Sequence, residues 1–149
     1  MDTRIMLKDK LKGMKETLPP VILDDHFRLR PDMAERYNDH QKLNFKKDVA
    51  WILSFLAESV WANQPVLFEE FIAWLRTFLG SVHVPMKDVR ESLELIHKRI
   101  SSGCSDEECS MINNCFLPAM AQFDQKDSPL SLPAIDRKST RLNSSHRIR

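Results

Sequence analysis

Three cysteines in the carboxyl-terminal half are the residues best suited to bind a metal or act as nucleophiles: Cys104, Cys109 and Cys115. A structural zinc site needs four ligands and usually takes its cysteines in closely spaced pairs. Here the gaps hold four and five residues, and His97 is the nearest further ligand. Cys109 and Cys115 instead fall on the inner side of a predicted helix, where thiols pack as small apolar groups. We therefore predict core cysteines, no metal site and free thiols in a reducing cytoplasm.

A second candidate for chemistry is an acidic and histidine-containing stretch formed by Asp24, Asp25 and His26, with Glu35 nearby in sequence. Carboxylates beside a histidine can bind a metal or transfer protons. However, the stretch follows Pro19-Pro20, which predicts a loop, and an Asp-Asp-His loop is usually solvated surface. No local motif joins a serine or cysteine nucleophile to a base. The sequence therefore predicts a protein that is not an enzyme.

Aromatic side chains at helical spacing form the third candidate. Trp51 and Phe55 are four residues apart, as are Trp74 and Phe78. They either belong to the core or line a surface that binds a ligand or a partner domain. His97 lies at the edge of a predicted buried helix face, where it is either a hydrogen-bonded structural histidine or a haem ligand. These five residues are the predicted ligand- or partner-binding set, and the prediction includes no catalytic or metal-binding residue.

The composition limits the kind of fold that can hold these candidate residues. A chain of 149 residues with 42% hydrophobic and 29% charged residues is expected to form one globular domain. Its three glycines leave no phosphate-binding glycine loop and disfavour a turn-rich β fold. No apolar run approaches the roughly 18 residues of a membrane span, and the amino terminus lacks the pattern of a secretory signal. We expect a cytoplasmic protein that binds neither membrane nor nucleic acid.

Hydrophobic periodicity predicts helices throughout, and no segment alternates as a strand does. The predicted helices cover residues 4–17, a short helix from Pro31, residues 41–61, residues 65–80, a helix from Pro85 to before Gly103, and one that begins at a Ser105–Glu108 capping box. Gly80 is expected in the left-handed conformation that closes a helix, and Pro118 should kink or end the last one. The predicted fold is all-α, a five- to six-helix bundle, with globin-like packing as an alternative.

The last fourteen residues, 136–149, are polar and basic without apolar periodicity, and they resemble the conceptual translation of a sequencing adapter. They hold five Lys or Arg and one Asp, so the remainder has 17 basic and 20 acidic residues and a formal net charge of −3 instead of +1. We therefore expect a helical sensory or interaction domain at 1–117, a linker at 118–135 and a non-native tail at 136–149. Without the tail the chain has a net negative charge, so the sequence does not predict a nucleic-acid-binding role.

About half of the chain, from Leu29 to Ile100, resembles a helical module found ahead of cobalamin-binding domains in bacterial regulatory and signalling proteins. The residues that carry the likeness are Arg36-Tyr37, Lys46-Lys47-Asp48, Leu53-Ser54-Phe55-Leu56-Ala57-Glu58, Pro65-Val66-Leu67-Phe68, Phe71-Ile72-Ala73-Trp74, Val84-Pro85-Met86-Lys87-Asp88 and Ser92-Leu93-Glu94. In such proteins a Pro-x-Leu-Phe opening, an aromatic-aliphatic-x-Trp step and a Val-Pro-x-x-Asp restart occur in this order.

The resemblance implies a non-catalytic sensory or dimerising region, truncated from a multidomain protein. Its partners would be a downstream cobalamin-binding domain or a second copy of the chain. Cobalamin itself is expected only in the missing downstream domain, because the histidine-bearing loop Asp-x-His-x-x-Gly is absent here. The alternative is a globin-like sensor that holds haem or an apolar molecule between its central helices.

Overall fold

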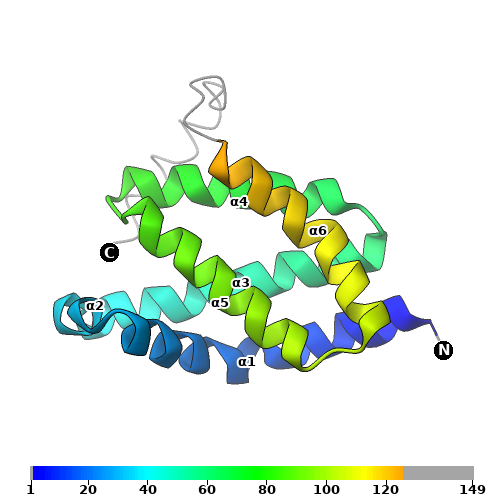
Figure 1. Cartoon of the computed structure of the whole chain (residues 1–149), viewed down its shortest axis with the longest axis horizontal. Helices are drawn as coiled ribbons and strands as arrows, with labels where there is room; N and C mark the ends of the chain where they lie inside the picture. Colours follow the sequence, from blue (N-terminus) through cyan, green and yellow to red (C-terminus); the bar gives the residue numbers. More distant parts are fainter. Residues whose placement is uncertain (1, 126–149) are drawn as a thin grey trace.

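The computed structural model describes residues 2–125, and it is helical almost throughout that range (Figure 1). Six helices follow one another: α1 (Thr3–Leu29), α2 (Pro31–Arg36), α3 (Asp39–Ala62), α4 (Pro65–Ser81), α5 (Met86–Ser102) and α6 (Asp106–Asp124). No strand occurs among the described residues. The prediction of an all-α, five- to six-helix bundle is confirmed.

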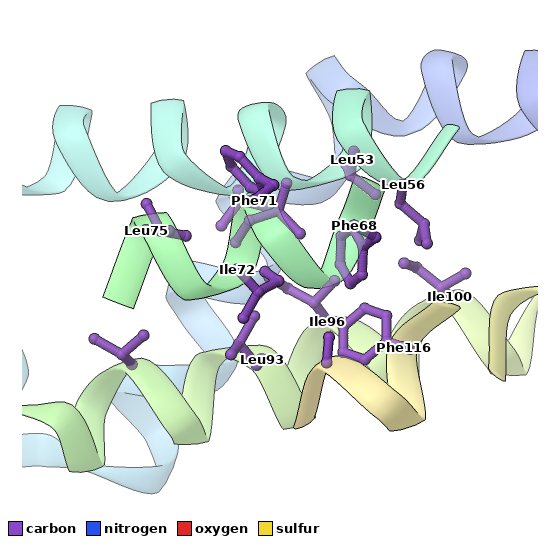
Figure 2. Packing of buried hydrophobic residues seen from close by; sticks show 14 of the residues in the cluster. Leu53, Leu56, Phe68, Phe71, Ile72, Leu75, Leu93, Ile96, Ile100 and Phe116 are labelled. Atoms are coloured by element: carbon purple, nitrogen blue, oxygen red, sulfur yellow. The ribbon is translucent and has the colours of Figure 1, made fainter. Parts of the chain in front are cut away.

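The helices form two layers. In Figure 1, α1, α3 and α4 run roughly side by side, and α5 and α6 cross over them at an angle. Helix α1 packs along α3, and α4 packs mainly against α6. Between the layers lie large apolar side chains from four helices, including the fully buried Phe68, Phe116 and Leu93 (Figure 2). No helix of the described residues is long and apolar enough to cross a membrane.

Helix α1 contradicts the prediction that Pro19-Pro20 ends the first helix. Both prolines lie inside α1, and the expected loop at Asp24, Asp25 and His26 is helical. A proline inside a helix removes a backbone hydrogen bond and costs about 3 kcal/mol. The helix continues because its buried face does: Leu11 and Ile22 are eleven residues, or about three turns, apart, and both are fully buried. Burial of apolar side chains on both sides of the prolines, at about 1.5–3 kcal/mol each, offsets the loss.

Helices α3 and α4 form an antiparallel pair joined by a tight turn. Asn38 and Gln41 cap α3 reciprocally, and Asn63 ends it in the left-handed conformation at φ 55°. Gly80 was predicted to end α4 in that conformation, but it is helical, and His83 has the positive φ of 68° instead. The amide of Val84 donates to the carbonyl of Leu79, which closes the helix in a Schellman arrangement. Closure at His83 instead of Gly80 places Val84 in the core.

Helices α5 and α6 begin and end largely as predicted. Helix α5 stops just before Gly103, and the Ser105–Glu108 capping box opens α6. Pro118 does not end α6, because Ala119, Met120 and Phe123 beyond it are buried and hold the following turns in place. Residues 118–124 are therefore helical and do not belong to a linker. The rest of the predicted linker, from residue 126, and the predicted tail at 136–149 lie outside the described residues.

Candidate functional site

The predicted aromatic residues of α3 and α4 do come together, and Phe71 joins them. The ring centroids of Trp51 and Trp74 are 5.1 Å apart, and those of Trp74 and Phe78 are 5.3 Å apart. Phe71 stacks on Phe55 with a centroid distance of 4.0 Å and meets the edge of Trp51 at 5.5 Å. The result is a continuous row of aromatic rings along the seam between the two helices.

On its outer side this row forms an apolar groove of about 500 Å³, which we call the α3–α4 groove. Its lining residues are Trp51, Ser54, Phe55, Glu58, Ser59, Leu67, Glu70, Phe71 and Trp74. Phe55 is 37% exposed and Leu67 is 41% exposed, whereas Phe78 is fully buried. Trp51, Phe55 and Trp74 therefore line the groove, and Phe78 supports it from the core. Sequence reasoning missed Phe71 and Leu67 as groove residues because their spacing equally fits the buried face of α4.

The groove exists because α3 is apolar on two sides. Ile52 and Leu56 face the core, and Trp51 and Phe55 extend the apolar surface toward solvent. The hydroxyl groups of Ser54 and Ser59 donate to the carbonyls four residues earlier, at 3.1 Å and 2.7 Å, so they are satisfied within the helix. An aromatic surface of this kind is typical of the places where proteins meet.

Acidic groups flank the groove. Glu58 accepts a bond from Lys12 of α1 at 2.9 Å, and this bond holds the pKa of Glu58 below its usual value. Glu70 is exposed on α4. Near the same end of α3, the ammonium group of Lys8 lies 4.8 Å from the ring centroid of Trp61. The two charged residues that line the groove are thus both carboxylates, one of which is paired with a neighbouring cation.

His97 does not join the aromatic groove. Its Nε2 lies 2.7 Å from Oδ1 of Asn113 in α6, and its ring contacts Phe116 with a centroid distance of 5.0 Å. Partly buried and hydrogen-bonded, it connects α5 to α6 in the way that a structural histidine does. These contacts give no support to His97 as a ligand of haem in the groove.

The cysteines are free thiols, and among residues 2–125 no group of His, Cys, Asp or Glu could hold a metal ion. Burial raises the pKa of Cys115 to about 11, so its sulfur is protonated at neutral pH. Burial also raises the pKa of Cys104. The thiolate is the reactive form of cysteine, so burial makes both thiols less reactive at neutral pH.

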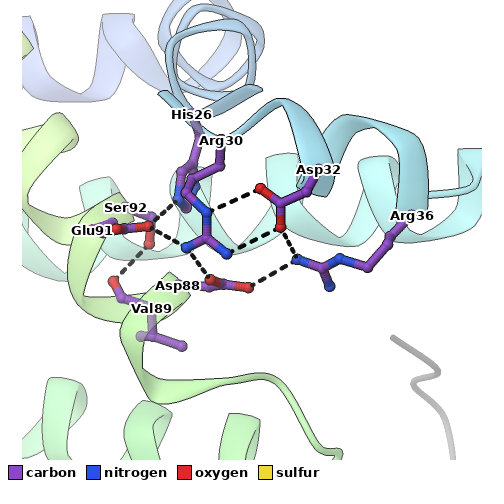
Figure 3. Close-up of polar contacts among 8 residues, drawn as sticks. All are labelled: His26, Arg30, Asp32, Arg36, Asp88, Val89, Glu91 and Ser92. Atoms are coloured by element: carbon purple, nitrogen blue, oxygen red, sulfur yellow. Dashed lines mark hydrogen bonds and ion pairs between the residues drawn. The ribbon is translucent and has the colours of Figure 1, made fainter. Parts of the chain in front are cut away.

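A group of charged residues that the sequence did not reveal connects α1 and α2 to the start of α5; we call it the polar clamp (Figure 3). Its centre is Arg30, whose guanidinium lies 3.2 Å from Asp88, 3.1 Å from Glu91 and 3.2 Å from Asp32. The bond from Arg30 lowers the pKa of Asp32 to about 2. Arg36 approaches Asp88 at 3.8 Å, which completes a ring of opposite charges.

His26 belongs to the same clamp. Its side chain is fully buried, and Nε2 lies 3.2 Å from Oε1 of Glu91. Asp25 instead pairs with Arg99 of α5, which holds the pKa of Asp25 below its usual value, while Asp24 and Glu35 are exposed. The four residues of the predicted carboxylate–histidine group therefore do not converge on one site. The charges of the clamp are paired, although His26 Nδ1 and Asp88 Oδ2 are buried without a hydrogen-bond partner. The cavity that Asp88 lines is only about 20 Å³, which is too small for a substrate.

Comparison with known proteins adds no assignment to this geometry. The chain matches no family model, and no curated protein matches it.

Proposed function

We propose that this chain is a non-catalytic helical regulatory or sensory module, truncated from a longer bacterial signalling protein, that acts by domain docking or dimerisation through the α3–α4 groove. The observation that carries the proposal is the groove itself, an open aromatic surface on two adjacent helices. Aromatic residues are enriched where proteins meet, and Trp51, Phe55 and Trp74 all line the groove.

The partner that the sequence resemblance supplies is a downstream cobalamin-binding domain in the cytoplasm. The sequence lacks the histidine-bearing loop Asp-x-His-x-x-Gly of such domains, so we expect cobalamin to be held by the downstream domain. The module would therefore contact the domain that holds cobalamin and would leave binding of the cofactor to it.

The test is a calorimetric titration of the full chain with a second protein. That protein is the domain encoded downstream in the uninterrupted genomic reading frame. We expect binding that Phe55→Ser weakens by about tenfold, because a central aromatic residue of an interface carries much of its affinity. Val66→Ser is the matched control: Val66 is an exposed apolar residue of α4 outside the groove lining. Absence of binding, or equal weakening by both variants, would contradict the proposed partner.

A second candidate is a sensor of an apolar small molecule, since a groove of about 500 Å³ falls in the range of ligand sites. Haem is the version that absorbance tests directly. If the chain binds haem, titration of the full chain with haem should shift the Soret band. Trp74→Ala should abolish the shift if haem lies in the groove, and His97→Ala should abolish it if His97 is the iron ligand. An unshifted band eliminates haem.

A further inference from the structure

One row of four side chains on α3 has a spacing that is the same when read from either end. Lys47, Trp51, Ser54 and Glu58 follow one another at intervals of four, three and four residues. The eleven residues from Lys47 to Glu58 make about three helical turns, so both ends of the row lie on one face, about 16 Å apart. Trp51, Ser54 and Glu58 line the α3–α4 groove, and Lys47 is exposed one turn before them.

Such a row is complementary to itself when a second copy lies antiparallel to it. A two-fold rotation about an axis that crosses α3 midway between Trp51 and Ser54 places Lys47 on Glu58 of the other copy. It also places Trp51, the largest side chain of the row, on Ser54, the smallest. Large side chains opposite small ones and cations opposite anions are what a self-complementary interface needs.

Other arrangements of two copies fit less well. If the two α3 helices ran parallel, Lys47 would face Lys47 and Glu58 would face Glu58, and like charges would repel. In the antiparallel arrangement the aromatic residues lie at the centre and the charges at the ends, which is the usual layout of an apolar interface core with a polar rim. Trp74, whose ring contacts Trp51, then lies close to the two-fold axis.

The existing contact of Glu58 leaves room for this pairing. Its bond to Lys12 lies at the surface, where the Glu58 side chain is 50% exposed. A carboxylate has about four acceptor positions, so it can accept bonds from Lys12 and from a lysine of another copy together. Phe55 and Leu67, exposed beside the row, would be covered at the same time.

We propose that the α3–α4 groove is covered by a second copy of this chain, related by a two-fold axis across α3 that pairs Lys47 of each copy with Glu58 of the other and seats Trp51 on Ser54. This inference rests on the proposed function, because it names the occupant of the same contact surface.

The experiment is sedimentation equilibrium of the full chain over a range of micromolar concentrations. The chain should form dimers.

Lys47→Glu should raise the dimer Kd by about tenfold, since it turns two attractive pairs per dimer into two repulsive ones. Glu58→Lys should do the same, and the double variant should return to within about threefold of the original Kd. Lys46→Glu makes the same charge change about 100° away around the helix and should leave the Kd unchanged.

Thermal melts of each variant show whether a changed Kd reflects a loss of folding. A chain that stays monomeric, a dimer that Lys47→Glu leaves unchanged, or a double variant that is not restored overturns the proposed interface. A monomer that still binds the downstream domain through Phe55 overturns self-association and leaves the proposed function standing. A dimer that does not bind that domain removes only the cobalamin-binding partner.

Discussion

The α3–α4 groove and the polar clamp lie on the same small bundle, but the groove is lined mostly by apolar side chains and the clamp consists of charged ones. The groove is lined mostly by aromatic and aliphatic groups and opens to solvent, so its contacts are incomplete. The clamp consists of charged groups that neutralise one another across α1, α2 and α5. Charged clusters often mark sites of chemistry, but here the charges are already paired. The contrast shows that exposed apolar surface, more than a cluster of paired charges, identifies where this molecule can contact a partner.

Among changes in these two regions, the largest effect on stability is expected when the clamp loses Glu91. Glu91→Ala leaves His26 without the bond to Nε2 and removes one of the carboxylates that neutralise Arg30. Leaving the buried His26 without this partner costs about 1–3 kcal/mol, whereas Arg30 keeps its contacts with Asp32 and Asp88. Urea unfolding measures this loss. Glu94→Ala on the same helix, where the carboxylate is largely exposed, is the control and should change the free energy of unfolding by less than about 1 kcal/mol. Similar losses in both would remove the distinction between clamp and surface.

A smaller effect on stability is expected in the groove. Phe55→Ala removes a ring that is 37% exposed and stacked on Phe71, so the free energy of unfolding should fall by about 1 kcal/mol. Phe68→Ala, in the core, should cost about 3–5 kcal/mol. Urea unfolding below the dimer Kd, where only the monomer contributes, checks both values. If the Phe55 variant lost as much as the Phe68 variant, the groove would be part of the core.

The smallest effect is expected from the exposed edge of the clamp as acid is added. The folded pKa of Asp32, about 2, lies below the unfolded value near 4. Its contribution to stability is therefore present above about pH 4 and is lost as the pH falls toward 2. Asp25 has a pKa shifted in the same direction by Arg99. Melting temperatures between pH 7 and pH 2 should fall in this window, and less steeply in Asp32→Asn. An unchanged slope in that variant would show that Asp32 does not contribute.

Local signals predicted the helices well where the ends of a helix are set locally. The Ser105–Glu108 capping box and the stop before Gly103 depend on residues a few positions apart, and both were found. Prolines show the limit of such local signals. Pro19 was expected to end a helix, and Pro118 to kink or end one, but both helices continue because buried side chains on the far side of each proline pack in the core. Gly80 was wrong by a few positions, because the helix closes at His83 instead.

The groove could be predicted from local spacing, and the clamp could not. The groove residues Trp51, Phe55 and Trp74 were predicted because Trp51 lies four residues before Phe55, and Trp74 lies four residues before Phe78, each pair within one helix. The clamp was missed because Arg30 and Asp88 are 58 residues apart in sequence and meet only after folding. The one hint was the unusual density of charge between Asp24 and Arg36, which indicated polarity without naming the partners.

The two consecutive prolines of α1 have a consequence for how this helix opens. Neither Pro19 nor Pro20 has an amide hydrogen, so the carbonyls of Lys15 and Glu16 lose their usual donors in the middle of a helix of 27 residues. With these backbone bonds absent, the two halves depend more on side-chain burial to stay joined at that point. Amide hydrogen exchange should therefore show two separate protected blocks in α1, with residues 22–29 exchanging together with the α5 amides near the clamp and residues 7–15 together with those of α3.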